Sequence, residues 1–190
     1  MKILIVGLGA IGSHVALALR NIDAELTLCD FDVIEHKNTQ AQFHTINDVS
    51  INKAKSIESN IYNLFDPLAS FASENHKITA KNAQYAIQRM GIVIDCTDNI
   101  AARTALIDAC GDTTPLLHGA MSADGTFAQA VWTERFTPDS EDGDGVTCEN
   151  GENLPFHMLV GSQVAILAQQ FLKSGVKNSV QITPTKIYRI

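Results

Sequence analysis

The sequence has little positive charge, few aromatic residues and no long apolar run. Its 14 Lys and Arg residues are outnumbered by 21 Asp and Glu residues, which gives a net charge of −7. We therefore expect neither nucleic acid nor an anionic membrane to be the main partner. No apolar stretch approaches the ~20 residues that a membrane-spanning helix needs. The first residues, MKILIVGLG, begin a strand pattern at once, which argues against a secretory signal peptide.

Cysteine is also scarce, and the four cysteines Cys29, Cys96, Cys110 and Cys148 are far apart. None belongs to a C-x-x-C pair, which argues against a structural zinc site of the usual spacing. The first three lie in apolar segments and are expected in the core, whereas Cys148 lies in a polar loop. Because paired cysteines are lacking, we expect a cytoplasmic protein in a reducing compartment.

The 190 residues, of which 45% are hydrophobic and 18% charged, suffice for one globular domain over residues 1–190. Apolar runs predict strands at residues 2–6, 25–29, 68–73, 92–95, 115–119 and 126–133, and a strand-like tail at 179–190 that Pro184 interrupts. Helical spacing predicts helices at residues 10–21, 50–64, 82–90, 100–110 and 156–173. Ser50 is the expected N-cap of the second helix, and Asp98 or Asn99 that of the fourth. Strands that alternate with helices predict a Rossmann-like, doubly wound α/β fold, with a mostly parallel sheet and helices on both faces.

A glycine-rich loop follows the first expected strand. Gly7, Gly9 and Gly12 form G-x-G-x-x-G, in which the glycines allow a tight turn, close approach of a phosphate and packing of helix on strand. Asp30 ends the second strand, where a carboxylate can accept hydrogen bonds from ribose hydroxyls. The pattern favours nucleotide binding over a purely structural turn, without distinguishing ATP from NAD.

Three further stretches carry motifs. Residues 30–43 are similar to the pattern D-x-D-x-V-x-x-x-N-L-x-R-Q, and residues 95–103 match D-x-T-D-N-x-x-x-R. Residues 49–53 form a short segment that ends in a lysine, Lys53. Together these stretches resemble the ubiquitin-activating superfamily, which includes the bacterial adenylyltransferases of thiamine and molybdopterin synthesis and in which the lysine is catalytic.

The resemblance implies ATP-dependent activation of the C-terminal carboxylate of a small ubiquitin-like or sulfur-carrier protein. It implies that Asp30 holds the ribose, that Lys53 neutralises phosphate charge, that Asp98 binds Mg²⁺, and that Asn38 and Gln42 line the phosphate region. The full set of implied ATP-binding residues is Gly7, Gly9, Gly12, Asp30, Asp32, Asn38, Gln42 and Lys53. Two alternatives stay open, namely that Lys53 is a solvated helix residue and that Asp98 only caps a helix.

The sequence departs from the family at Ala41, which stands where relatives carry an arginine. Relatives often receive a second arginine from a segment that precedes the first strand of a partner subunit, and we expect this segment to be absent here. Lys37 is near in sequence, but no neighbouring cation is an obvious substitute. We therefore expect weaker stabilisation of the triphosphate than in relatives.

Cys148 stands where some relatives carry a sulfur-transferring or thioester-forming cysteine, so it is a candidate nucleophile. Its acidic neighbours disfavour a thiolate, and an incidental loop cysteine is the alternative. His157 lies close enough in sequence to assist it, or else caps the next helix.

Two other functions compete with adenylation. One is a degenerate scaffold of the same family that binds a nucleotide or a partner protein, which Ala41 favours. The other is an NAD(P)-dependent oxidoreductase, which the glycine loop alone would equally suit. The resemblance further implies a homodimer.

Overall fold

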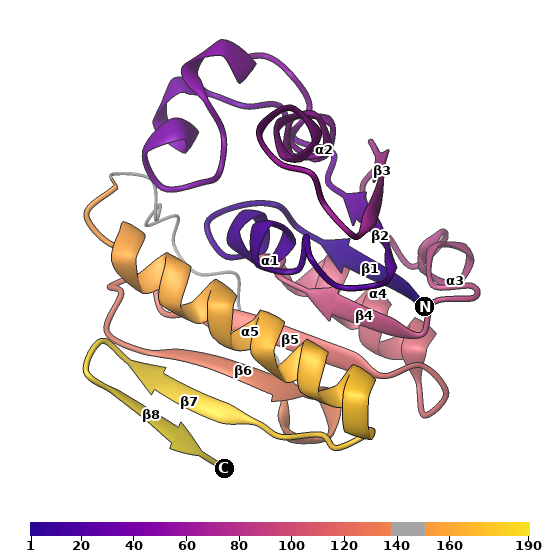
Figure 1. The fold of residues 1–190 in the computed structure, drawn as a ribbon. Coiled ribbons are helices and arrows are strands. Elements are labelled where there is room, and N and C mark those ends of the chain that lie inside the picture. The colour runs from indigo at the N-terminus through magenta and orange to yellow at the C-terminus, as the bar shows by residue number, and fades with distance from the viewer. Residues whose placement is uncertain (138–150) are drawn as a thin grey trace.

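The computed structural model describes residues 1–137 and 151–190 and places them around one eight-stranded sheet (Figure 1). The strand order is β3-β2-β1-β4-β5-β6-β7-β8. Neighbouring strands from β3 to β5 pair in parallel, and the remaining pairings are antiparallel. The predicted α/β fold with a mostly parallel sheet and helices on both faces is therefore confirmed.

The parallel strands form the half of the sheet that carries the glycine loop. They are β1 (Lys2–Val6), β2 (Glu25–Cys29), β3 (Ser70–Glu74), β4 (Ile92–Asp95) and β5 (Leu116–Met121). Central strands of a parallel sheet are covered on both faces, which explains the unbroken apolar runs of β1 and β4. The chain crosses from one side of β1 to the other after β3, so the carboxyl ends of β1 and β4 flank the switch point at which doubly wound sheets bind ligands.

The antiparallel half consists of β6 (Ala128–Trp132), β7 (Val180–Thr183) and β8 (Lys186–Arg189). Thr183 pairs with Lys186 across a tight connection that contains Pro184. The predicted interruption of the tail by Pro184 is confirmed, because proline has no N–H to donate to a strand ladder.

Helices cover both faces of the sheet. α1 (Gly12–Ala18), α2 (Lys53–Leu64) and α5 (Leu154–Ser174) lie on one face, and α3 (Ala83–Ala86) and α4 (Ile100–Cys110) lie on the other (Figure 1). Alternate residues of β1 point to opposite faces. Ile3 and Ile5 accordingly join the apolar cluster under α1, α2 and α5, whereas Leu4 and Val6 join the cluster under α4. Among the described helices, none has the length and apolar character needed to cross a membrane.

The expected N-cap of α2 differs from the observed one, whereas one of the two expected N-caps of α4 is observed. Ser50 has a φ of 75° and does not cap α2, so that prediction was wrong. The cap is Asn52, whose Oδ1 accepts a hydrogen bond from the Lys55 N–H. Asn99 caps α4 in the same way through the N–H of Ala102, as one of the two expected caps. Between β2 and α2 the chain forms two 3₁₀ helices, η1 (His36–Gln40) and η2 (Ile46–Asp48), and a third, η3 (Thr133–Arg135), follows β6.

Candidate functional site

A cleft of about 480 Å³ lies at the carboxyl ends of β1, β2 and β4. This volume falls in the range of small-molecule pockets, roughly 300–1,000 Å³. The structure brings together at the cleft most of the residues that the sequence singles out, namely Gly7, Gly9, Asp30, Asp32, Gln42, Lys53 and Asp98. The cleft is therefore the candidate functional site.

The three glycines of the loop meet different surroundings. Gly7 has a φ of 82°, and a Cβ there would lie 2.9 Å from backbone atoms of Cys96 and Thr97. A Cβ on Gly12 would lie 1.8 Å from the carbonyl oxygen of Gly7. Gly9, in contrast, has no atom nearer than 4.0 Å to the position of its absent Cβ, so its backbone is open to the cleft. This is the arrangement that a phosphate-binding loop needs.

Asp30 ties the glycine loop to the turn after β2. Its Oδ2 accepts a hydrogen bond of 2.6 Å from the Leu8 N–H, and its Oδ1 accepts one of 2.8 Å from the Asp32 N–H. Burial raises the pKa of the Asp30 carboxyl, although these two hydrogen bonds oppose the rise. Asp30 thus sets the shape of the cleft as well as lining it.

Lys53 begins α2, and its ammonium is held against the cleft by an ion pair. Its Nζ lies 3.1 Å from the Oδ2 of Asp32, and its side chain is 10% exposed. The amide of Asn52 donates to the carbonyl oxygens of Asp30 and Asp32, which fixes the helix start against the turn. The alternative that Lys53 is a solvated helix residue is therefore wrong.

Asn38 and Gln42 take different positions. Asn38 is buried in η1, where its Oδ1 accepts a hydrogen bond from the Glu35 N–H, and it is not among the residues that line the cleft. This hydrogen bond stabilises the loop from within. Gln42 does line the cleft, and its buried Oε1 has no hydrogen-bond partner among the described residues. A buried acceptor without a partner is an atom that a bound ligand can satisfy.

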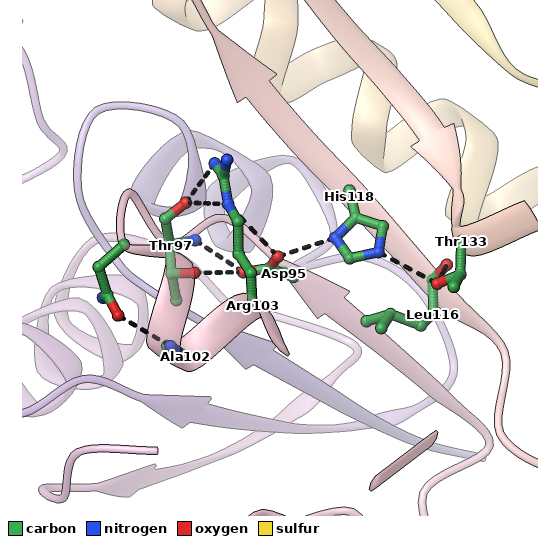
Figure 2. Close-up of polar contacts among 8 residues, drawn as sticks. Asp95, Thr97, Ala102, Arg103, Leu116, His118 and Thr133 are labelled. Carbon is green, nitrogen blue, oxygen red and sulfur yellow. Dashed lines mark hydrogen bonds and ion pairs between the residues drawn. The ribbon is translucent and has the colours of Figure 1, made fainter. Parts of the chain in front are cut away.

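The turn after β4 is stabilised by its own residues (Figure 2). The Oδ1 of Asp95 accepts hydrogen bonds from the N–H and hydroxyl of Thr97 at 2.9 and 2.7 Å. Its Oδ2 lies 2.8 Å from the Nδ1 of His118 and 3.8 Å from the Nε of Arg103. Arg103 also donates twice to the carbonyl oxygen of Thr97. These contacts fix the turn in one shape.

Asp98 is the one acid of this turn that faces solvent and the cleft. Since Asn99 caps α4, the alternative that Asp98 is merely the cap is wrong. Its carboxylate oxygens are of the hard type that Mg²⁺ prefers.

His118 supports the turn after β4 through its contact with Asp95, and the sequence analysis missed this role. Its Nε2 lies 3.1 Å from the hydroxyl of Thr133, and its ring stacks on Phe136 at a centroid distance of 4.0 Å. It comes from β5, so no spacing in the sequence could have paired it with Asp95.

Ala41 is fully buried, and its carbonyl oxygen lies 3.1 Å from the Nε2 of His14. Lys37 pairs with Glu35 and lines a different hollow. The described cations that line the cleft are Lys53, Lys77 and Arg103. Lys77, whose Nζ lies 5.1 Å from the centre of the Phe31 ring, was not expected from the sequence.

The cysteines partly follow the expectations. Cys29 and Cys110 are buried, and burial raises the pKa of each thiol to about 12. Cys96 is half-buried and lines the cleft. Cys148 lies outside the described residues. His157 is fully buried within α5 rather than capping that helix, and burial lowers its pKa.

Comparison with known proteins gives a consistent result. A family model described as the ThiF family matches residues 1–179. "Adenylyltransferase and sulfurtransferase MOCS3" of Aedes aegypti is 32% identical over 111 residues, which are 57% of this chain and 25% of the relative. "Sulfur carrier protein ThiS adenylyltransferase" of Escherichia coli K12 is 31% identical over 119 residues, 61% of this chain and 47% of the relative. The chain thus spans about a quarter to a half of the length of these relatives.

The fold recurs in solved structures. The crystal structure of E. coli MccB with ATP matches 100% of this chain and 62% of that chain with a TM-score of 0.73. The sequence identity is 17%, so this likeness shows a shared fold.

Proposed function

The chain belongs to the ThiF family, and from this premise we propose that it binds ATP in the cleft and adenylates the C-terminal carboxylate of a ubiquitin-like or sulfur-carrier protein. The observation that carries the proposal is the meeting of an open Gly9 backbone, a buried Asp30, a held Lys53 and an exposed Asp98 around one cleft. The fold shared with MccB, whose solved structure contains ATP, supports the choice of nucleotide.

In the proposed complex, the phosphates lie on the glycine loop at the N-terminus of α1. Unpaired N–H groups and the positive end of the helix dipole favour an anion there. The ribose lies at Asp30, at the end of the neighbouring strand β2. The open surface of Gly9 lets the phosphates approach the backbone closely.

The proposed reaction is attack by a carboxylate oxygen of the partner protein on the α-phosphorus of ATP. The bond between the α-phosphorus and the bridging oxygen of pyrophosphate breaks, so the products are an acyl-adenylate and pyrophosphate. Lys53 stabilises the negative charge that builds on the phosphate oxygens, and its ion pair with Asp32 holds the ammonium in place before the reaction. Arg103 holds the turn after β4 through the Thr97 carbonyl.

Asp98 is the proposed Mg²⁺ ligand. The fit rests on its chemistry and position, because it offers hard oxygen donors at the rim of the cleft while the other acid of the turn, Asp95, is buried among protein partners. A bound Mg²⁺ would neutralise phosphate charge.

A second candidate function is a non-catalytic, nucleotide-binding scaffold of the same family, which Ala41 favours. Its small buried side chain carries no positive charge that could bind the triphosphate.

For the adenylating enzyme, we propose that Lys77 and Lys53 supply this positive charge instead and that adenylation is slow. The homodimer, the single domain over residues 1–190 and a cytoplasmic location are further proposals, as is the nucleophilic role of Cys148.

ATP–pyrophosphate exchange in the presence of small sulfur-carrier proteins, the ThiS type among them, tests the proposal. We expect thermal protection by ATP with Mg²⁺ but not by NAD(P)H, and exchange that depends on the carrier's C-terminus. Protection by ATP without exchange for any carrier would favour the scaffold. Protection by NAD(P)H alone would favour an oxidoreductase. If the Cys148→Ser variant still catalyses ATP–pyrophosphate exchange but no longer transfers the activated carboxyl group, Cys148 acts in a step after adenylation.

A further inference from the structure

Three side chains with metal-binding chemistry meet beside the cleft, at the ends of β2 and β3. Cys29 and Glu74 are the last residues of these strands and are partners in the parallel ladder, so their side chains point to the same face. His76 follows two residues after Glu74. One ligand atom from each residue lies within 4.8 Å of the other two.

The separations approach those of a metal centre. The Sγ of Cys29 lies 3.8 Å from the Nε2 of His76, whereas the Oε2 of Glu74 lies 3.7 Å from the other ring nitrogen, Nδ1. A single ion binds one ring nitrogen, and with one ligand atom from each side chain all three atoms lie within 4.8 Å of one another. Zinc bonds of ~2.3 Å to sulfur and ~2.0 Å to nitrogen at a tetrahedral angle place those two atoms ~3.5 Å apart. The side chains of His76 and Glu74 are 38% and 42% exposed, so a small rotation of either can bring the carboxylate into the set.

We propose that Cys29, Glu74 and His76 bind a divalent transition-metal ion of the zinc class, with one coordination position open to the cleft. Thiolate and imidazole favour such ions over Mg²⁺ or Ca²⁺, which distinguishes this site from the magnesium role of Asp98. The open position follows from the place of Cys29 and His76 in the cleft wall. Three protein ligands and one free position are typical of exchangeable or catalytic zinc sites.

A bound ion would replace the proton of the Cys29 thiol, which the surroundings of the thiol keep in place. Burial, together with the charges of Glu74 and Asp30, raises the pKa of the Cys29 thiol to about 12, so the metal-free thiol keeps its proton. On binding, the Sγ–H bond breaks, the metal–Sγ bond forms and the proton leaves to solvent. The positive ion then compensates the two nearby carboxylates.

A Co²⁺ titration of the untagged, metal-free full chain tests the site without any nucleotide, so its outcome is separate from that of adenylation. We expect one equivalent of Co²⁺ to give a thiolate-to-cobalt charge-transfer band and tetrahedral visible bands, and Zn²⁺ to displace it. Cys29→Ser should abolish the charge-transfer band. His76→Gln, at a half-buried position, should weaken Co²⁺ binding by at least about tenfold.

Cys110→Ala and Cys148→Ser are the matched controls, since they remove one thiol each and leave the three ligands intact. Both should keep the band and the stoichiometry. The proposal is overturned if the wild type gives no charge-transfer band, if Cys29→Ser retains it, or if Cys148→Ser loses it. Unchanged Co²⁺ affinity in His76→Gln, with a native circular dichroism spectrum, would equally overturn it.

Discussion

The turns after β2 and β4 have the same local design at the two sides of the cleft. Asp30 directly follows β2 and Asp95 is the last residue of β4, and the Oδ1 of each accepts the backbone N–H two residues further on. The distances are 2.8 Å from Asp32 to Asp30 and 2.9 Å from Thr97 to Asp95. In both turns the first acid therefore organises the backbone and the second acid, Asp32 or Asp98, lines the cleft.

The two turns differ in how the acids are neutralised. Asp32 has its own cation, Lys53 at 3.1 Å, whereas no ion pair to Asp98 exists among residues 1–137 and 151–190. Asp95 is paired with His118 and Arg103, while Asp30 bonds to the backbone of the glycine loop. In the proposed complex, the turn after β2 is the phosphate side, where Lys53 is held by Asp32, and the turn after β4 is the metal side, where Asp98 has no ion pair among the described residues.

The largest effect is expected from breaking the turn after β4 at its buried acid. Asp95→Ala leaves Arg103 and His118 without their shared carboxylate, and losing one partner of a buried pair costs roughly 3–5 kcal/mol. Urea unfolding should show this loss. The same measurement on Asp98→Ala should show a change within about 0.5 kcal/mol, because that side chain is exposed. Equal losses in the two variants would contradict the division of roles between the acids.

The next effect is expected at the held lysine of the turn after β2. Lys53→Met keeps the buried stem but removes the charge, so ATP–pyrophosphate exchange should fall by about 10²–10³, or roughly 2.7–4 kcal/mol of transition-state stabilisation. Lys55→Met, an exposed position on the same helix, serves as the control and should exchange normally. Similar rates in the two variants would show that Lys53 has no electrostatic role.

The free energy of unfolding, measured as a function of pH, tests the side of the turn after β2 in a second way. The helix α2, which begins with Lys53, packs on a buried histidine. The Nδ1 of His44 lies 3.1 Å from the hydroxyl of Ser56, and burial lowers its pKa from 6.5 to about 4. The unfolded chain therefore takes up this proton at higher pH than the folded one, and stability falls as the pH drops from 6.5 to 4. The difference corresponds to about 3 kcal/mol.

His44→Gln removes this titration, so the free energy of unfolding should lose correspondingly less between pH 6.5 and 4. His36→Gln, at an exposed position of η1, is the control. Identical pH profiles for wild type and His44→Gln would mean that His44 takes no part in the acid response.

The sequence could predict the features that depend on short stretches of chain. Apolar runs locate the strands, the spacing of Gly7, Gly9 and Gly12 locates the loop, and Asn99 is recognisable as a cap because capping is a contact over three residues. Ser50 was misassigned because its positive φ belongs to a turn that only the connection through η2 produces.

The contacts that define the site depend on strand order and register, which short patterns do not contain. Asp95 meets His118 because β4 pairs with β5. Cys29 meets His76 across 47 positions because β2 pairs with β3. The burial of Lys53 depends on how Asn52 anchors α2 to the turn after β2.

The smallest expected effect is the most direct test of the metal side of the cleft. Calorimetry of ATP binding with Mg²⁺ and with EDTA should show at least about tenfold tighter binding with Mg²⁺ in the wild type, or about 1.4 kcal/mol. Asp98→Asn should lose most of this enhancement with an unchanged fold, whereas Asp32→Asn should keep it. An Asp98→Asn variant that responds to Mg²⁺ as the wild type does would contradict the assignment of the two turns.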